Sequence, residues 1–396
     1  MNTAAQSKQT LQVAALVLVA LGLLAVVFYT PVWWVSLTAP NYPEESFPDG
    51  VRIHFHMNGV FNGCEKQTKA EIQEEEALDC VHEMDTINHY VGMYPIAAGG
   101  PVERGFSQFL MVYLGIMLLG FVCTQPKIRM SVMGAGFAGV VIWMYLSIYS
   151  DDGFNLLNEG YVSALVTSLD QEATGESAEP EIVIGGITGV LKKSLEDSGV
   201  EVVLPSQVAA AKAKDKDSSA KGHLIEQLRA TYDIDQSKSD KLQPWNGSAF
   251  QVMSWHYAKS LGRYFNNPKE ILPMVANLEL AINIVFIGLI GSMLLLLFGA
   301  RKNGGILYWL LILVPMALPI FFIIDYSAWL WWYGHTLNDM GAFSVKPFMP
   351  TVFGDGKVAQ FTTHSYPYIG FGLMMLLSAV LAVAALLRIK QFKESE

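Results

Sequence analysis

Six long apolar runs dominate the pattern of hydrophobic and polar positions along the chain. A helix needs roughly 20 apolar residues to cross about 30 Å of hydrocarbon, and each run approaches or exceeds that length. The first run is longer than the core of a usual signal peptide, which favours a retained helix over a cleaved one. The pattern predicts an all-α membrane protein with six transmembrane helices, near residues 11–35, 106–123, 130–149, 272–298, 306–333 and 368–387.

Lysine and arginine gather in the short segments between these runs and at both ends of the chain. Short cytoplasmic segments of membrane proteins carry an excess of these residues, so the pattern predicts both termini inside. The long polar segments, which hold most of the acidic residues, then lie outside. The basic residues concerned are Lys8, Lys127, Arg129, Arg301, Lys302, Arg388, Lys390 and Lys393.

The polar segments predict an extracytoplasmic cap of mixed α/β character. Residues 51–57 alternate like a strand, with Ile53, Phe55 and Met57 on one face and His54 and His56 on the other. Residues 65–79 read as a solvated helix, and a charged insertion at about 168–243 shows helical patterns near 189–196 and 224–230 and short strand patterns at 182–187 and 200–204. We interpret that insertion as a small soluble unit or a partner-facing flap.

These predictions divide the chain into seven parts. They are a cytoplasmic tail with the first helix (1–37), a motif loop (38–105), a helical hairpin (106–149), the loop with the insertion (150–271), a second hairpin (272–333), a cap loop (334–367), and the last helix with its tail (368–396).

Composition excludes several classes of function. The 396 residues are 52% hydrophobic and only 16% charged, whereas about a quarter are charged in a soluble domain. The formal net charge of -10 disfavours nucleic acid as a partner. The sequence has no P-loop for ATP and no CxxCH for covalent haem. We expect a multi-pass protein of the bacterial inner membrane with its main loops in the periplasm.

All eight histidines fall in the predicted outer loops or at the outer membrane face, and several methionines lie near them in the sequence. Imidazole and thioether ligands suit copper, above all Cu(I), because soft sulfur selects the soft ion. The hypothesis places primary ligands at His54, His56 and Met57, and two further histidines in the third outer loop. The full set of candidate metal ligands is His54, His56, Met57, His82, His89, Met93, His335 and His364.

Cys64 and Cys80 lie in the same outer loop. In an oxidising compartment such a pair forms a disulfide, worth roughly 3 kcal/mol in the chain-entropy model. The alternative is a zinc site in which both thiolates join His82 and His89. A disulfide would leave only histidine and methionine, which favours copper over zinc.

Two acidic residues and one asparagine stand out within the predicted helices. Glu279 and Asn283 are four apart and share a helix face, and Asp325 lies about two turns from the outer end of the fifth run. Acids inside a membrane are costly and mark functional sites by default. Two interpretations stay open: a structural hydrogen-bond network, or an outward-facing polar pocket. A separate functional hypothesis is a quinol-linked electron-transfer subunit with Glu279 or Asp325 near a quinol site.

Four short motifs resemble a group of polytopic bacterial membrane proteins encoded beside nitrous oxide reductase and its maturation factors. They are HFHMNG at 54–59, MDTINHYVGM at 84–93, KPFMP at 346–350 and AQFTT at 359–363. The resemblance implies a periplasmic context of copper-dependent respiration and gives no ligand assignments.

Two functions follow as hypotheses. The first is a non-enzymatic accessory protein that handles copper for a periplasmic cuproenzyme, in the resembled context nitrous oxide reductase. The alternative is a membrane anchor or respiratory subunit that docks a periplasmic electron-transfer partner and is linked to quinol. Neither hypothesis assigns catalytic residues.

Overall fold

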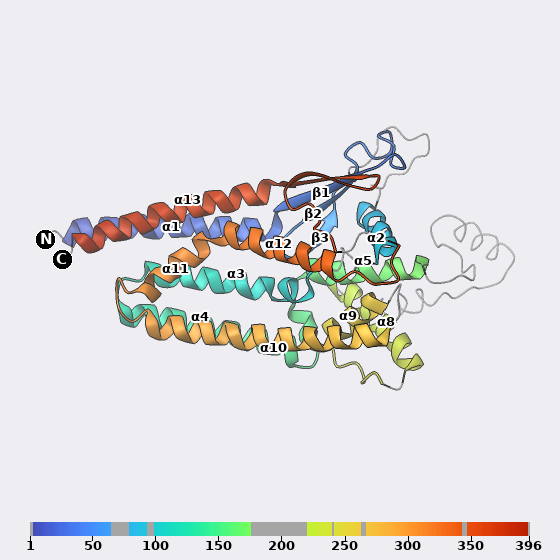
Figure 1. Cartoon of the computed structure of the whole chain (residues 1–396). Coiled ribbons are helices and arrows are strands. Elements are labelled where there is room, and N and C mark those ends of the chain that lie inside the picture. Colours follow the sequence, from blue (N-terminus) through green and yellow to red (C-terminus); the bar gives the residue numbers. More distant parts are fainter. Residues whose placement is uncertain are drawn as a thin grey trace, which may run out of the picture.

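Long helices run side by side through most of the structure, and a small sheet lies at one end (Figure 1). This computed structural model describes residues 3–64, 79–92, 99–175, 220–239, 241–262, 267–342 and 347–394. Five of its described helices are long and apolar enough to cross a membrane, and a bent pair makes a sixth if counted as one span. The five are α1 (Thr3–Tyr29), α3 (Pro101–Val122), α4 (Pro126–Tyr149), α10 (Pro268–Gly299) and α13 (Ile369–Lys393).

Proline marks where several of these helices begin. The first or second helical position of α3, α4 and α10 is a proline, which fits there because the first-turn N–H groups have no partner within the helix. Proline also follows the end of α1, at Pro31. The prediction that the first helix runs to Val35 was wrong, because residues 33–38 form a strand instead.

The fifth apolar run is broken. It forms α11 (Ile306–Met316) and α12 (Leu318–His335), whose axes differ by 65°. Pro319 cannot donate to the carbonyl four residues before it and its ring clashes with that carbonyl, so the helix cannot continue straight. Ser378 of α13 donates a 2.6 Å hydrogen bond to the carbonyl of Met316, one of the groups that the break releases.

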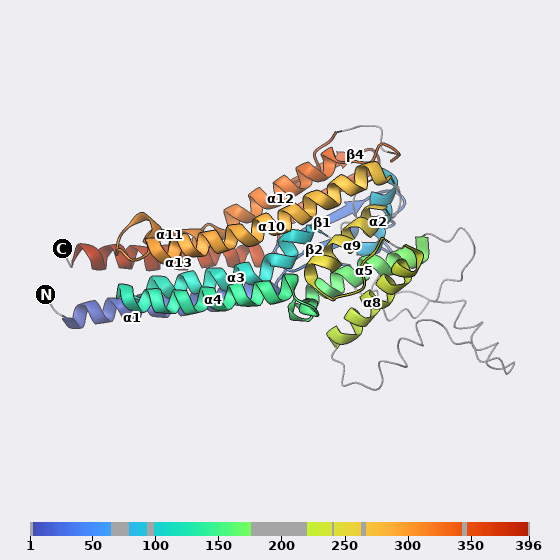
Figure 2. The same ribbon diagram turned by 90° about the horizontal axis from the view of Figure 1, so that it is seen from below.

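The two ends of the helical bundle differ. Both termini lie at one end, together with the short connections from α3 to α4 and from α10 to α11, and we call this the termini end (Figures 1 and 2). The sheet and the shorter helices lie at the other end, which we call the cap end. This arrangement puts the predicted inner segments together and the predicted outer segments together.

The cap contains a five-stranded antiparallel sheet in the order β3-β2-β1-β5-β4. The strands are β1 (Trp33–Thr38), β2 (Val51–Phe55), β3 (Val60–Asn62), β4 (Gly354–Val358) and β5 (Phe361–Pro367). β2 confirms the predicted strand. β1 and β5, which no pattern indicated, join the two ends of the chain because they continue the packed pair α1 and α13.

One face of the sheet packs on α2 (Cys80–Val91) and α12. Ile53 and Phe55 point into this core, as the alternation predicted, and Val51 joins them. Met57, predicted on the same face, lies beyond the end of β2 and packs against the helical core instead. Trp33 donates from Nε1 to Ser365 Oγ at 2.9 Å. The disulfide Cys64–Cys80 is confirmed and ties the start of α2 to the end of β3.

Three helices and a short 3-10 turn form the rest of the described cap. They are η1 (Gly153–Leu156), α5 (Glu159–Gly175), α8 (Ala220–Lys238) and α9 (Ala249–Gly262). α8 confirms the helical pattern near 224–230. The patterns at 182–187, 189–196 and 200–204 lie outside the described residues, as does all but the last residue of 65–79.

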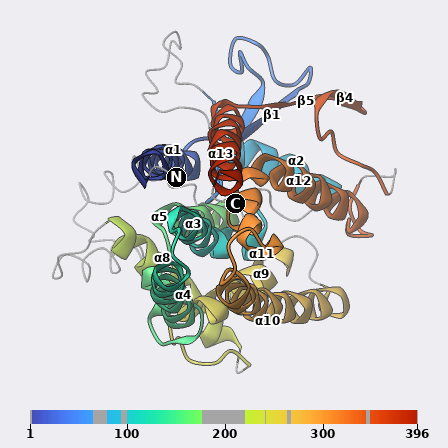
Figure 3. The same ribbon diagram turned by 90° about the vertical axis from the view of Figure 1, so that its left-hand side faces the viewer.

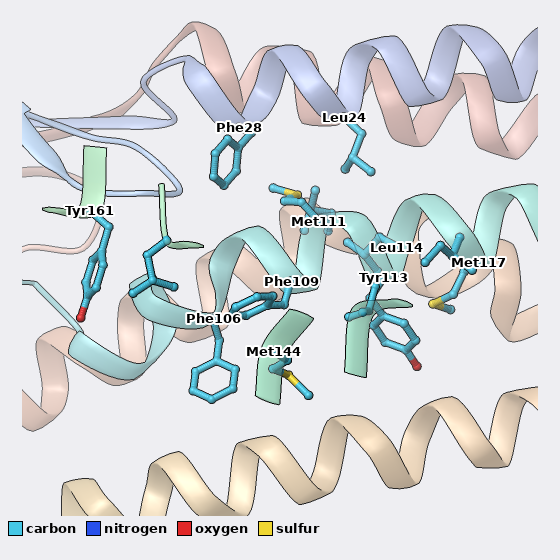
Figure 4. Close-up of a cluster of buried hydrophobic side chains, with 14 of the residues drawn as sticks. Leu24, Phe28, Phe106, Phe109, Met111, Tyr113, Leu114, Met117, Met144 and Tyr161 are labelled. Carbon is cyan, nitrogen blue, oxygen red and sulfur yellow. The ribbon is translucent and has the colours of Figure 1, made fainter. Parts of the chain in front are cut away.

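α3 lies at the centre of the bundle. Figure 3 looks along the helices and shows α1 and α13 on one side of α3, with α4 and α10 on the other. In Figure 4 the side chains of α3 point both ways: Phe106 and Tyr113 toward α4 and α10, and Met111 toward Leu24 and Phe28 of α1. Accordingly 78% of the residues in an apolar 18-residue stretch of α3 are buried, whereas only 17% are buried in the corresponding stretch of α10.

Candidate functional site: a cavity beneath the cap

His54 lies on β2, on the face opposite Ile53 and Phe55. Its ring stacks on Tyr368 with centroids 5.1 Å apart, and Arg52 lies on the same face. Burial, followed by the charges of Arg52 and His56, lowers the pKa of His54 to about 4. His54 is therefore a neutral imidazole at pH 7.

His56 lies in the turn between β2 and β3. Its backbone N–H donates to the carbonyl of Gly59 at 2.8 Å, and its ring meets the edge of Phe61 at 4.8 Å. Burial lowers the pKa of His56 and the charge of Arg104 adds to that effect, while a hydrogen bond to the carbonyl of Tyr29 opposes it. This imidazole is also neutral at pH 7.

The other predicted ligands lie on separate elements. His364 of β5 donates from Nδ1 to Asp355 at 2.7 Å, and this bond contributes to lowering the pKa of Asp355. His335, at the end of α12, donates to the carbonyl of Trp331 at 2.7 Å and stacks on its ring. His82 and His89 lie on α2, and Met93 lies outside the described residues.

The described residues do not gather the predicted ligands into a metal centre. No group of three or more His, Cys, Asp or Glu that could hold a metal ion occurs among them. The disulfide uses both thiolates, so a zinc site on Cys64 and Cys80 would require the reduced protein. Copper binding would rest on His54 and His56, completed by the thioether of Met57.

A cavity of about 630 Å³ lies where the β2–β3 turn meets the helices. Its walls come from that turn, the first turns of α3, the middle of α10, and α12. Six aromatic rings line it, contributed by Phe55, Phe106, Phe321, Phe322, Tyr326 and Trp329. The rest of its apolar wall comes from Met57, Val102, Leu110, Val285, Leu289, Leu318, Ile324 and Ala328.

The polar groups of the cavity lie toward the cap. They are His56, Glu103, Arg104, Ser107 and Asp325. Glu103, Arg104 and Ser107 belong to the first two turns of α3, whereas Leu110 lies one turn deeper. On α12, Asp325 lies about 10 Å along the axis from Leu318, which is beside the bend. The cavity is therefore amphipathic, with one polar end and one apolar end.

Two glycines permit the conformation of the charged pair at the start of α3. Gly99 has a φ of +54°, and a Cβ there would collide with the guanidinium of Arg104; a Cβ on Gly100 would collide with the carboxylate of Glu103. Both side chains thus fold back against the glycine backbone. Arg104 is buried, whereas Glu103 is exposed.

Of the three polar residues predicted within the membrane, some fit the structural hydrogen-bond network and one fits the polar pocket. Asn283 accepts a 2.7 Å hydrogen bond from the Tyr149 hydroxyl and donates to the carbonyl of Glu279 at 2.8 Å. These bonds join α10 to α4, which is the structural network. Asp325 instead lines the cavity. Glu279 does not contribute to the cavity wall.

A buried polar cluster around His256 was not predicted from the sequence. His256 of α9 lies 2.8 Å from Ser168 Oγ and 3.1 Å from the carbonyl of Leu165, both on α5. Burial lowers its pKa to about 4, and the charge of Lys259 acts in the same direction. Both side chains are almost fully buried, so this Ser–His contact joins two helices and is not a nucleophile open to substrate. The spacing of His256 and Ser260, one helical turn apart, was the available signal.

The four short motifs that carry the family resemblance lie mostly in the cap. Asn58, in the β2–β3 turn, donates to the side chain of Asn158 at 3.4 Å and packs on Gly160. The backbone N–H of Asn338 donates to the carbonyl of Gly92 at 2.9 Å, which ties the end of α2 to the segment after α12. Lys346 lies outside the described residues.

Searches of family models, of curated proteins and of solved structures find no match to this chain.

Proposed function

We propose that this chain is a multi-pass membrane protein that binds an amphiphilic, lipid-soluble small molecule in the cavity between α3, α10 and α12. The amphipathic wall of that cavity carries the proposal. Ligand sites are concave, mostly apolar and supplied with a few polar groups that fix orientation, and volumes of about 300–1,000 Å³ are usual. This cavity has each of these properties.

The position of the cavity favours entry from the bilayer. Phe321 and Ile324 line it and are also 51% and 59% exposed on the surface of α12. The helix α10 forms the neighbouring wall, and most residues of its apolar 18-residue stretch are not buried by the rest of the protein. A molecule dissolved in the membrane thus reaches the cavity without crossing a polar surface.

The cap supplies the second half of the proposal. We place it on the periplasmic side of a bacterial inner membrane, from the distribution of lysine and arginine. There it would dock a soluble partner, a cuproenzyme or an electron-transfer protein, directly above the bound ligand. In this role the chain is a ligand-binding membrane subunit.

Photolabelling tests the cavity directly. The probe is a long-chain alcohol that carries a diazirine, applied to detergent-purified protein, with labelled peptides identified by mass spectrometry. We expect labels on α12 and on the start of α3, reduced at least fivefold by Leu289→Trp, which fills the cavity. Leu280→Trp is the matched control, because Leu280 is 57% exposed on the same helix and lies outside the cavity wall. Equal labelling of both variants and wild type would refute the proposal.

Copper handling is a second candidate function. It is favoured by one observation, the burial of His54 and His56, which lowers the pKa of both imidazoles and leaves neutral nitrogens for a metal. Nε2 of His54 is buried without a hydrogen-bond partner among the described residues. With Met57, this pair would offer two imidazoles and a thioether to Cu(I).

Metal analysis tests this second candidate. Protein purified under reducing, copper-replete conditions is analysed for copper, zinc and iron per chain. Copper near one equivalent, lost in His54→Ala but retained in the exposed control His335→Ala, would support copper handling. His54 is the test residue because His56 also lines the cavity. Metal-free protein would exclude the copper role.

A further inference from the structure

We infer that the amphiphile bound in this cavity is a quinol, held by its ring and hydroxyl groups at the polar end with its tail toward the bilayer. The inference rests on the proposed function and names the class of ligand. It follows from the charge balance of the polar end, from the aromatic wall and from the placement of hydrogen-bonding groups.

The charges at the polar end disfavour a phospholipid headgroup. Among the described residues that line the cavity, Glu103 and Asp325 carry carboxylates and Arg104 carries the one guanidinium. His56 adds no positive charge, because burial and Arg104 keep its imidazole neutral. A phosphate would gain Arg104 and the N-terminus of α3 as partners, but it would also lie near two carboxylates, which repel it. A neutral headgroup avoids this repulsion.

The wall matches a flat ring. Aromatic side chains pack on one another in offset or edge-to-face geometry, and such contacts add about 0.5–1.5 kcal/mol to the burial of their area. Phe322 and Tyr326 of α12 already stack with an interplanar angle of 8°, and both line the cavity. An aromatic ring placed here meets flat surfaces, whereas the headgroup of an ordinary lipid offers none.

Hydrogen-bonding groups come from different walls. His56 belongs to the β2–β3 turn and Asp325 belongs to α12, so they approach the cavity from separate elements. A neutral imidazole and a carboxylate both accept hydrogen bonds. A quinol carries two hydroxyl donors on opposite sides of one ring, whereas the oxidised quinone carries only acceptors. We therefore expect the reduced form to bind more tightly than the oxidised form.

Competition against the diazirine alcohol tests the inference. Decylubiquinol, decylubiquinone and dioleoyl phosphatidylethanolamine are each titrated into detergent-purified wild-type protein before photolabelling. We expect decylubiquinol to displace the probe at a concentration at least tenfold lower than the other two. Displacement by the phospholipid at equal or lower concentration would overturn the inference, and so would equal displacement by quinone and quinol.

Variants locate the headgroup. His56→Leu and Asp325→Leu should each weaken displacement by quinol about tenfold, while direct labelling by the alcohol persists. His56→Gln, which retains hydrogen bonding, should bind more tightly than His56→Leu, and this pair separates lost contact from poor folding. Glu279→Leu is the control on α10, because Glu279 lies outside the cavity wall. Unchanged displacement in both leucine variants would overturn the inference.

The two proposals fail differently. If the alcohol labels the cavity but quinol does not compete, the quinol inference is wrong and the proposed function stands. If the cavity is not labelled at all, the proposed function itself is wrong.

Discussion

The two ends of the helical bundle use buried arginine in opposite ways. At the termini end, Arg129 donates five hydrogen bonds of 2.6–3.3 Å, to the carbonyls of Gly120, Cys123 and Ala300 and to the side chain of Asn303. Arg388 donates to the carbonyls of Phe121 and Val122 and to Gln391. At the cap end, Arg104 lines a cavity beside two carboxylates.

The difference lies in where along α3 each positive charge is placed. The carbonyls that Arg129 and Arg388 bind belong largely to the last turn of α3, where the helix dipole is negative and the carbonyls have no partner within the helix. Both guanidiniums also lie over aromatic rings, of Tyr308 and Phe121. Arg129 and Arg388 therefore cap the C-terminus of α3. Arg104, at the start of α3, instead lies where the dipole is positive, so its role is not to cap the helix.

Removal of the Arg129 side chain should lower the stability of the protein more than any other proposed substitution. Arg129→Met leaves several buried carbonyls without donors, and each such group costs about 1–3 kcal/mol. We expect a loss of roughly 3 kcal/mol or more, seen as a lower Tm in detergent. Arg301→Met is the control, because Arg301 is exposed and lies over the Phe298 ring. Similar Tm losses in both variants would contradict the capping role.

Acid should act on the cap end through His256. Its folded pKa of about 4 lies below the unfolded value of about 6.5, so the unfolded chain binds the proton first and stability falls as pH drops from 6.5 to 4. The contribution is on the order of 3 kcal/mol. His256→Gln, which does not titrate, should flatten the acid-unfolding curve measured by circular dichroism. Exposed His335→Gln should leave the curve unchanged, and an equally steep curve in both variants would refute the assignment.

Gly99→Ala should have the smallest effect and should act on binding. The new Cβ would displace the guanidinium of Arg104, so we expect quinol competition to weaken roughly tenfold, about 1.4 kcal/mol. Gly304→Ala is the matched control: its φ is +74°, but a Cβ there meets open space. Both variants carry backbone strain of about 1–2 kcal/mol. A binding loss shared by both would show that strain alone, and not the position of Arg104, is responsible.

Sequence patterns predicted the helices better than their ends or partners. The apolar runs located the helices because length and composition are local properties, and the spacing of Cys64 and Cys80 in one outer loop indicated their disulfide. They missed the strand at Trp33, since an apolar run looks the same in a helix and in a buried strand. They also did not reveal the break at Pro319, or the pairing of β1 with β5, which lie more than 300 residues apart.

The candidate ligands show the same limit. His54 and His56 were predicted as a pair, yet His54 stacks on Tyr368 while His56 lines the cavity. Asp325 was recognised as an intramembrane acid, but no pattern connected it with Arg104. The reason is that these residues belong to elements far apart in the chain.

The sequence by itself determined a multi-pass membrane protein, the prolines at which its helices start and the disulfide of its cap. These follow from local hydrophobicity, backbone chemistry and cysteine content. Only the tertiary structure decided which polar residues share a cavity. His56, Arg104 and Asp325 line one cavity because the β2–β3 turn, the start of α3, and α12, which bends by 65° from α11, come together there. Such convergence depends on contacts between distant segments, which no local pattern records.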